Sequence, residues 1–415
     1  MNKWIAIAGS TALMTWSFGA NAWLPDAAPN LLPTPLVRQA IEQDPTVVEA
    51  RRALAAAGHG AAALRVGSHE WTARATAQSR KYDAGGRSNE WETGLERGFR
   101  VAGKARLDGE IGTTDIDIAK AQVGEAIHES AKALADLWMD VVTAGRLKEV
   151  ISEQRGFAQA NLKAAESRRK AGDASVLDVN LATTDLIEVD RQLSAAATSE
   201  QKARAKLRAR FPLITEVPRI VPDPRPLEIA QAQWRERILA ESDVVRVAEG
   251  QARKAELTAD RMRADKTPDP TVGVFVASEA RRSERIYGVS LSIPLSGTYR
   301  NERMLQSLQE AEAARTRLDG KRRELEMEIT DTYIDATGSF ERWRLSAQGL
   351  EATQSSARLT QRAYTLGEID LQGLLLARKQ ALDATLATEQ ARVEAVRAQS
   401  RLMIDAHLVW DLHED

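Results

Sequence analysis

The distribution of proline constrains the fold of this chain more than any other feature of its sequence. None of the 13 prolines lies between residues 46 and 211 or after residue 294. A proline inside a helix removes a backbone hydrogen bond and costs about 3 kcal/mol, so its absence permits very long helices. Five prolines cluster instead at 212–226, and this segment is predicted to be a linker between two halves of the chain.

The two halves are predicted to be structural repeats. Asp136 aligns with Asp331, and the same offset carries Gly172 onto Gly367 without a gap. Self-similarity at a fixed offset indicates duplication of one supersecondary unit. The first repeat, 23–211, is predicted to contain a helix, a strand hairpin at 71–101 and a long helical hairpin whose tip lies near 172. The linker 212–226 follows. The second repeat, 227–415, is predicted to contain a helix, a strand hairpin at 271–295 and a long helical hairpin whose tip lies near 367.

The predicted helices carry a coiled-coil period. Alternating steps of four and three residues from Ile116 to Arg155 meet apolar side chains at 8 of 12 positions, and the same reading from Met304 to Ala336 meets 7 of 10. This period predicts a narrow seam between helices instead of a broad core face. If 104–170 is helical throughout, that helix is about 100 Å long.

Four segments between the helices alternate apolar and polar residues, which predicts strands with one apolar face. Strands of about ten residues have the length needed to cross a bilayer at a tilt. Four strands cannot close a barrel, and open edges are not tolerated in lipid, so the pattern predicts a trimer with 12 strands. Two soluble hairpins packed on helices remain an alternative, because half-buried soluble strands alternate identically. The four segments are 71–81, 91–101, 271–278 and 285–295.

Residues 1–22 are predicted to be a secretory signal peptide. Lys3 supplies the positive charge, an apolar stretch follows, and Ala20-Asn21-Ala22 is a cleavage site of the A-x-A type. The mature chain would begin at Trp23. Because this residue is not cysteine, no lipid anchor is expected there.

Composition excludes several classes of function. The 57 Lys and Arg residues balance 59 Asp and Glu residues, which argues against a nucleic-acid partner. Mean hydropathy of -0.37 excludes a polytopic helical membrane protein, and the absence of cysteine excludes thiol catalysis. The stretch 58–63 fits G-x-G-x-x-A, but it lies in a helical pattern without a preceding strand. No catalytic constellation is evident, so we expect neither an enzyme nor a cofactor.

The most specific motif is a helix–turn–helix tip that occurs twice, at 168–179 and 362–371. Gly172 and Gly367 suit the left-handed residue that ends a helix. Ser175-x-x-Asp178 resembles a capping box that would start the next helix.

These paired motifs, each placed after a strand hairpin and a long helix, resemble the outer-membrane efflux proteins of the TolC type over essentially the whole mature chain. The resemblance implies a mainly α fold with a small β part, in which long antiparallel coiled-coil helices carry four transmembrane strands per chain. It also implies a homotrimer with a 12-stranded barrel in outer-membrane lipid and an α-helical tunnel in the periplasm. The tips would contact a periplasmic adaptor, the membrane fusion protein, which links the channel to an inner-membrane pump of the RND type.

The chain looks most like the heavy-metal efflux subgroup, of the CzcC, CnrC and CusC type, which implies export of heavy-metal cations. A channel for drugs or secreted substrates is the alternative within this family. A periplasmic coiled-coil protein with a structural or tethering role is the alternative from another class.

The resemblance also assigns residues to the tips. An adaptor is expected to contact Gly172, Asp173, Ser175, Gly367 and Glu368. Asp178 and Tyr364 match two members of the closing network of TolC, and a hydrogen bond between them would form a gate. Ile369 stands where the family has an arginine, and Gly373 and Leu376 stand where it has an acidic constriction. The alternative for Asp178 is that it only caps its helix.

Overall fold

The computed structural model describes residues 32–217, 221–280, 283–295, 297–410 and 412 of the 415-residue chain. The predicted signal peptide 1–22 lies outside these residues. The fold is mainly α-helical with one four-stranded sheet, which confirms the predicted fold class. The elements are α1 (Thr34–Glu42), α2 (Pro45–Val66), β1 (Thr72–Lys81), β2 (Arg87–Gly98), α3 (Lys104–Ala171), α4 (Val176–Arg210), α5 (Gln231–Glu241), α6 (Asp243–Ala264), β3 (Thr271–Glu279), β4 (Glu284–Ser292), α7 (Thr298–Thr365) and α8 (Leu371–Asp405).

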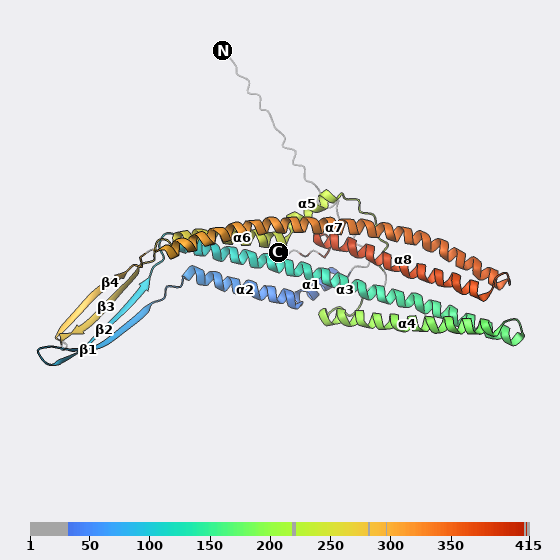
Figure 1. The fold of residues 1–415 in the computed structure, drawn as a ribbon, viewed down its shortest axis with the longest axis horizontal. Coiled ribbons are helices and arrows are strands. Elements are labelled where there is room, and N and C mark those ends of the chain that lie inside the picture. The colour runs from blue at the N-terminus through green and yellow to red at the C-terminus, as the bar shows by residue number, and fades with distance from the viewer. Residues whose placement is uncertain (1–31, 218–220, 281–282, 296, 411, 413–415) are drawn as a thin grey trace, which may run out of the picture.

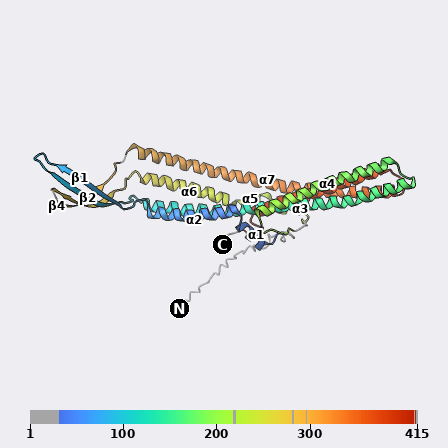
Figure 2. The same cartoon turned by 90° about the horizontal axis from the view of Figure 1, so that it is seen from below.

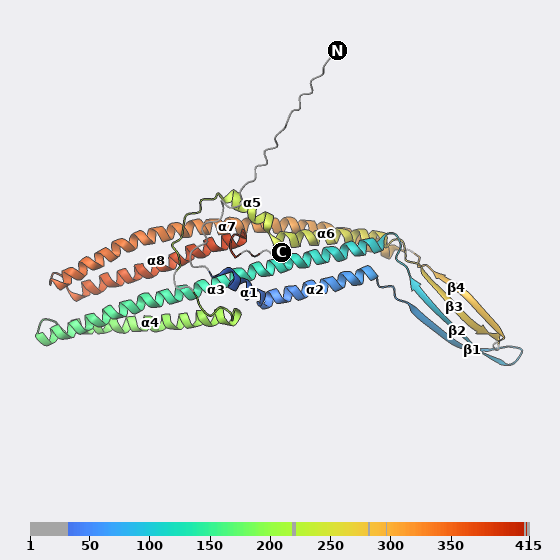
Figure 3. The ribbon, with the colours of Figure 1, turned by 180° about the vertical axis from the view of Figure 1, so that it is seen from behind.

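The molecule is elongated, with the sheet at one end and two helical tips at the other (Figures 1 and 3). Helices α3 and α7 have 68 residues each and run most of its length, which confirms the helix predicted over 104–170. At 1.5 Å per residue each is about 100 Å long. The stretch 58–63 lies inside α2, without the strand that dinucleotide binding requires. Among the described helices, none combines the length and the apolar character needed to span a membrane.

Each long helix is accompanied by two shorter ones that lie end to end. Helices α2 and α4 pack along α3, and α6 and α8 pack along α7 (Figure 1). One contact holds α2 and α4 at their junction: Asp44 caps α2 by accepting from the Thr46 backbone N–H at 2.9 Å, and it also accepts from Arg210 Nε, at the end of α4, at 2.8 Å. Figure 2 shows α1 beside the middle of the helical layer.

The sheet is antiparallel with the order β1-β2-β3-β4. β2 begins at Arg87, earlier than the predicted 91, because pairing with β1 continues to Lys81 opposite Arg87. The register places Leu95 opposite both Ala73 and Val274, and Val274 opposite Val289. Directly opposed residues share a face. The predicted apolar positions of all four strands therefore lie on one face of the sheet.

The opposite face of the sheet is polar. Glu90 accepts from Gln78 Nε2 at 2.9 Å and pairs with Arg80 at 3.1 Å, and Arg80 also reaches Glu279 at 3.4 Å. The apolar exceptions on this face are Phe275, Ala277 and Ile286. The Phe275 ring lies across Gly288, where an added Cβ would come within 2.2 Å of the ring. A larger residue at position 288 would therefore require the ring to move.

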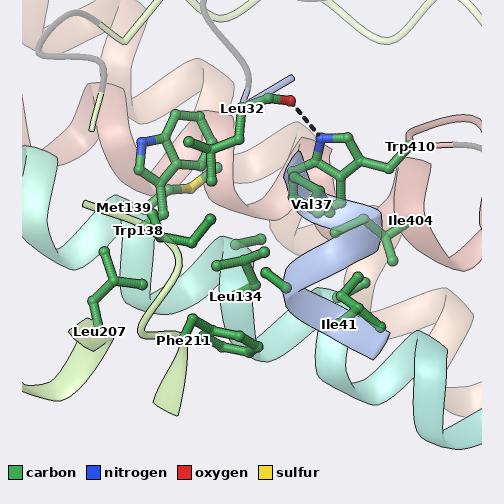
Figure 4. Packing of buried hydrophobic residues seen from close by; sticks show 14 of the residues in the cluster. Leu32, Val37, Ile41, Leu134, Trp138, Met139, Leu207, Phe211, Ile404 and Trp410 are labelled. Carbon is green, nitrogen blue, oxygen red and sulfur yellow. Dashed lines mark hydrogen bonds between the residues drawn. The ribbon is translucent and has the colours of Figure 1, made fainter. Parts of the chain in front are cut away.

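The largest apolar core lies midway along the helices (Figure 4). Here α3 does not bury only the predicted narrow seam, since Ala131, Ala135, Trp138, Met139 and Val142 are buried beside the seam positions. The reason is that α1 and the C-terminal segment cover α3 in addition to its helical neighbours. Figure 4 shows the Trp410 indole closing this core, where its N–H donates to the carbonyl of Leu32 at 3.1 Å.

A buried ionic network that no sequence pattern indicates joins the sheet to the helices. The Lys104 side chain is 1% exposed, and its ammonium donates to the Thr267 carbonyl at 2.7 Å and to Asp269 Oδ1 at 2.8 Å. Asp265 Oδ1 lies 3.1 Å from the same nitrogen. Lys104 comes from the first half of the chain and its partners from the second. The network therefore fixes the two strand hairpins to each other where α3 begins.

Candidate functional site: the two helical tips

Each tip is a tight turn that begins with a left-handed glycine. Gly172 has φ 87° and Gly367 has φ 79°, which confirms the predicted conformation. In the first tip the Asp173 N–H donates to the Arg168 carbonyl at 2.8 Å. In the second, the Glu368 N–H donates to the Ala363 carbonyl at 2.9 Å. These bonds satisfy carbonyls at the ends of α3 and α7, and they make the two tips equivalent.

Asp178 forms the capping box that starts α4. Its carboxylate accepts from the backbone N–H and the hydroxyl of Ser175, both at 2.8 Å, while Ser175 Oγ accepts from the Asp178 N–H at 3.1 Å. The bond from the Ser175 backbone lowers the pKa of Asp178 most, followed by the bond from the Ser175 hydroxyl. The carboxylate therefore stays ionised at neutral pH. Asp370 starts α8 in a similar way, by accepting from the Gly373 N–H at 2.9 Å.

Tyr364 contacts an arginine instead of Asp178. Arg168 Nη1 donates to the phenol oxygen of Tyr364 at 3.1 Å, and its guanidinium lies 5.5 Å from the centre of the ring. Among the described residues of one chain, no hydrogen bond joins Tyr364 to Asp178. The predicted gate pair is thus not formed within these residues, where the hydrogen bonds of Asp178 are those of the helix cap. Arg168 sits at the end of α3 and Tyr364 at the end of α7, so this contact joins the two tips.

The tips expose apolar side chains that the sequence analysis did not single out. Leu177 is 64% exposed beside the first tip, and Leu366 is 66% exposed in the second. The polar tip residues Asp173, Ser175 and Glu368 are exposed around them. Exposed apolar side chains rimmed by polar ones are typical of protein interaction surfaces. Helix periodicity could not find these leucines, because Leu366 ends α7 and Leu177 lies in the first turn of α4, where no seam has been established.

One layer above the tips, Arg378 of α8 reaches across to the other helical hairpin. Its guanidinium lies 4.4 Å from the ring centre of Phe157 in α3 and donates to Gln361 Oε1 at 2.6 Å. Burial lowers the pKa of Arg378, and the nearby Asp185 carboxylate only partly opposes this shift. Among the described residues Arg378 forms no ion pair. The contact with the Phe157 ring therefore joins the two hairpins near the tips, whereas the bond to Gln361 lies within the second hairpin.

Ion pairs hold the same two hairpins together farther from the tips. Arg146 of α3 pairs with Glu389 of α8 at 3.3 Å, and Arg401 of α8 pairs with Asp136 of α3 at 2.6 Å. Hydrogen bonds between two charged groups are about twice as strong as neutral ones. Ion pairs between the hairpins thus lie toward the middle of the molecule, whereas a buried apolar cluster that includes Ala165, Leu371 and Leu374 joins the hairpins near the tips.

No protein-family model matches the chain, and no curated protein matches it. Several solved structures are similar to the chain. The outer membrane protein VceC of Vibrio cholerae covers 90% of this chain and 95% of its own at 17% identity, with a TM-score of 0.75. CusC covers 90% of this chain and 91% of its own at 11% identity, with a TM-score of 0.78. The CmeC outer membrane channel of Campylobacter jejuni covers 100% of this chain and 96% of its own at 11% identity, with a TM-score of 0.78.

This chain has the fold of the TolC-type outer-membrane channels. The similarity extends over the strand hairpins and the helical hairpins alike, because it covers at least 90% of the chain in each comparison. In this fold the sheet and the tips lie at opposite ends, about the length of α3 apart. The sequence motifs therefore placed the strands and the tips correctly relative to each other.

Proposed function

We propose that this protein is the outer-membrane exit channel of a tripartite efflux system. The observation that carries the proposal is the four-stranded sheet. One of its faces bears most of its apolar residues, and no other described element covers that face. Val289 is 75% exposed and Leu291 is 65% exposed on that face. Lipid is the medium that favours an apolar face on ten-residue strands. The chain would thus lie in the outer membrane with its helices in the periplasm.

Closure of the sheet supports a homotrimer. Among the described residues, strands β1 and β4 each pair on one side only, so each leaves one edge unpaired. β1 and β4 run in opposite directions, so β4 of one copy fits β1 of the next in an antiparallel pairing. Three copies give a closed barrel of 12 strands, which removes every edge.

The helices supply a second contact between copies. Helix α7 exposes the apolar residues Met327, Ile334, Leu345 and Leu359, each more than half exposed in the single chain. A face of this kind on a long helix requires a partner helix. We infer that neighbouring copies cover it and that the helices of three chains enclose a tunnel.

We infer that the tips contact a periplasmic adaptor, and through it an inner-membrane pump of the RND type. The exposed leucines Leu177 and Leu366, with Asp173, Ser175 and Glu368 around them, provide the surface. Gly172 and Gly367 set its shape. The channel itself is a passive duct, and the pump supplies the energy.

We infer that heavy-metal cations are the cargo, because the sequence resembles the CzcC, CnrC and CusC subgroup. Within the described residues no group of three or more His, Asp or Glu side chains could hold a metal ion. The cargo would therefore pass without a resident metal site in those residues. Drugs or secreted substrates are the alternative cargo. Loss of zinc, copper or cobalt resistance in a deletion strain, restored by the intact gene, tests this assignment.

We further infer that Arg168 and Tyr364 hold the tips of one chain together and so favour a narrow tunnel end. Single-channel recordings test this role. Tyr364→Phe and Arg168→Gln should each raise conductance, and the double variant should add little. Asp178→Asn should leave conductance unchanged and only lower the melting temperature, because Asp178 caps α4. Equal effects of all three variants would contradict this assignment.

Cell fractionation tests the proposed function as a whole. The full chain should be found in the outer membrane as a trimer that dissociates on heating. A soluble periplasmic protein would contradict the proposal and favour a structural or tethering coiled coil.

A further inference from the structure

A basic groove lies where the helices meet the sheet. It is formed by α2, α3 and α6, encloses about 430 Å³, and is lined by three arginines, Arg65, Arg106 and Arg253. Glu110 is the only acidic residue in its lining. Gly109 forms part of its floor, and an added Cβ there would meet no atom within 4 Å. The groove is therefore open, and it carries a net positive charge.

The arginines of the groove are only partly neutralised. Arg106 pairs with Glu110 on the same helix and its side chain remains 67% exposed. Arg253 is 3.5 Å from Glu256, whose carboxylate is also engaged by Arg315 at 2.8 Å. Within the described chain, the Arg65 guanidinium has no hydrogen bond or ion pair. Two of the three arginines can thus bind an external anion without losing a strong partner.

The backbone under the groove is held rigidly by buried groups. Arg100 donates to the carbonyls of Leu64 and Arg65, each at 2.7 Å, and thereby fixes the end of α2. The same side chain pairs with Asp108 at 2.7 Å, and Asp108 in turn accepts from Arg261 of α6 at 2.6 Å. This chain of contacts ties all three helices together. The arginines therefore project from a framework that is already in place.

The groove lies on the outer side of the helical layer. Arg106, Thr113, Ile127 and Leu134 of α3 are separated by multiples of seven residues. Residues with this spacing lie on one face of a helix in a coiled coil. Ile127 and Leu134 belong to the core that α1 covers. A tunnel must stay open at its centre, so the face that α1 and the C-terminal segment cover is the outer one.

The end of the groove that includes Arg106 also lies next to the level expected for lipid headgroups. β2 ends at Gly98, and Arg106 is only two residues into α3. If the strands cross the outer membrane, the first turns of α3 are next to its periplasmic surface. Basic groups at this level attract the phosphates of anionic lipids.

We propose that this groove binds the phosphate of an anionic phospholipid headgroup in the periplasmic leaflet of the outer membrane. Arg65 and Arg253 contact the phosphate, and Arg106 keeps the groove positive. The acyl chains continue along the apolar face of the neighbouring strands. This inference rests on the proposed location in the outer membrane.

Lipid binding by the purified full-length trimer tests the proposal. Native mass spectrometry would count bound phosphatidylglycerol, with diacylglycerol as the probe that lacks phosphate and inorganic phosphate as the probe that lacks acyl chains. We expect only phosphatidylglycerol to bind. Arg65→Gln combined with Arg253→Gln should weaken its binding about 25-fold, at about fivefold for each arginine. The control variant combines Arg208→Gln with Arg344→Gln. Arg208 lies in the last turn of α4 and Arg344 pairs with Glu341, both outside the groove, so lipid binding should not change.

A second variant separates lipid binding from folding. Gly109→Glu places a carboxylate in the groove, and glutamate is more favourable than glycine inside a helix, so the protein should stay folded while lipid binding falls. Gly156→Glu is the matched control, because it lies in the same helix and a Cβ there also meets no atom within 4 Å.

Three outcomes would overturn the lipid site. The first is that the groove variants bind phosphatidylglycerol as well as their control variants do. The second is that the protein binds diacylglycerol as tightly as phosphatidylglycerol. The third is that it binds inorganic phosphate as tightly as phosphatidylglycerol, which would indicate a site for a free anion. Fractionation reports the location independently. A trimer in the outer membrane with unaltered lipid binding would contradict this inference alone, whereas a soluble protein would contradict the proposed function.

Discussion

Replacing Lys104 by methionine is expected to loosen the junction between the sheet and the helices. The change removes two charge-assisted hydrogen bonds, to Thr267 and Asp269, each worth about 1.5 to 3 kcal/mol. It also leaves the Thr267 carbonyl without its donor. Asp269 keeps its bond from the Val101 N–H at 3.0 Å, and His69 lies 3.1 Å from it, which offsets part of the loss. We therefore expect the free energy of local opening at the start of α3 to fall by about 3 kcal/mol.

Hydrogen exchange followed by mass spectrometry measures this opening directly, without reversible unfolding of the trimer. A loss of 3 kcal/mol corresponds to exchange about 100-fold faster, since each 1.4 kcal/mol is tenfold. The effect should appear in peptides that cover 98–112. Peptides from the middle of α8, 380–395, should exchange as before, because α8 does not contact the network.

Two comparisons test the reasoning behind this magnitude. Lys202→Met removes an exposed lysine from another helix and should leave exchange unchanged throughout. Lys104→Arg keeps the charge and should cost less than Lys104→Met. Unaltered exchange over 98–112 in Lys104→Met would refute the view that the buried ammonium holds the junction. It would show that apolar packing and the remaining ion pairs suffice.

Three further predictions concern other parts of the molecule. Gly367→Val forces a branched residue into left-handed backbone at a cost of about 1 kcal/mol or more, so efflux measured by resistance should be lost while the trimer persists; resistance retained at equal expression would place docking elsewhere. Leu291→Arg places a charge on the apolar face and should cost about 2 to 4 kcal/mol, seen as less assembled trimer in the outer membrane; normal trimer levels would count against a lipid-facing strand. Burial alone would raise the pKa of Asp44, but bonds from Thr46 and Arg210 outweigh it and hold the pKa below 3.8. Asp44→Asn should therefore cost about 1 to 2 kcal/mol at neutral pH, and its melting temperature should begin to approach that of the native protein as pH falls below about 4; a difference that is as large at pH 3 as at pH 7 would contradict this account.

Local chemistry explains why much of the fold was predictable. The absence of proline from 46–211 permitted α3, and strict alternation marked the strands. Gly172 and Ser175 specified the end of α3 and the start of α4 through backbone conformation and capping, which involve only neighbours in the chain. Such features act over a few residues, so the sequence contains them completely.

Contacts between distant segments were not predictable in the same way. The partner of Tyr364 proved to be Arg168, which lies 196 residues away in the chain. A hydrogen-bond donor of this kind has no signature in sequence spacing, because the relative rotation of α3 and α7 decides which side chain arrives. The same holds for the breadth of the core on α3, since the burial of Trp138 depends on the covering α1 and C-terminal segment.

The sequence by itself therefore determined the elements, their order and the apolar face of each strand, since these follow from local propensity and periodicity. Only the tertiary structure decided that all four apolar faces coincide, that Lys104 is buried among carboxylates of the other half, and that three arginines converge beside the sheet. These properties depend on strand register and helix packing. Register and packing join residues far apart in the chain, and no local pattern records them.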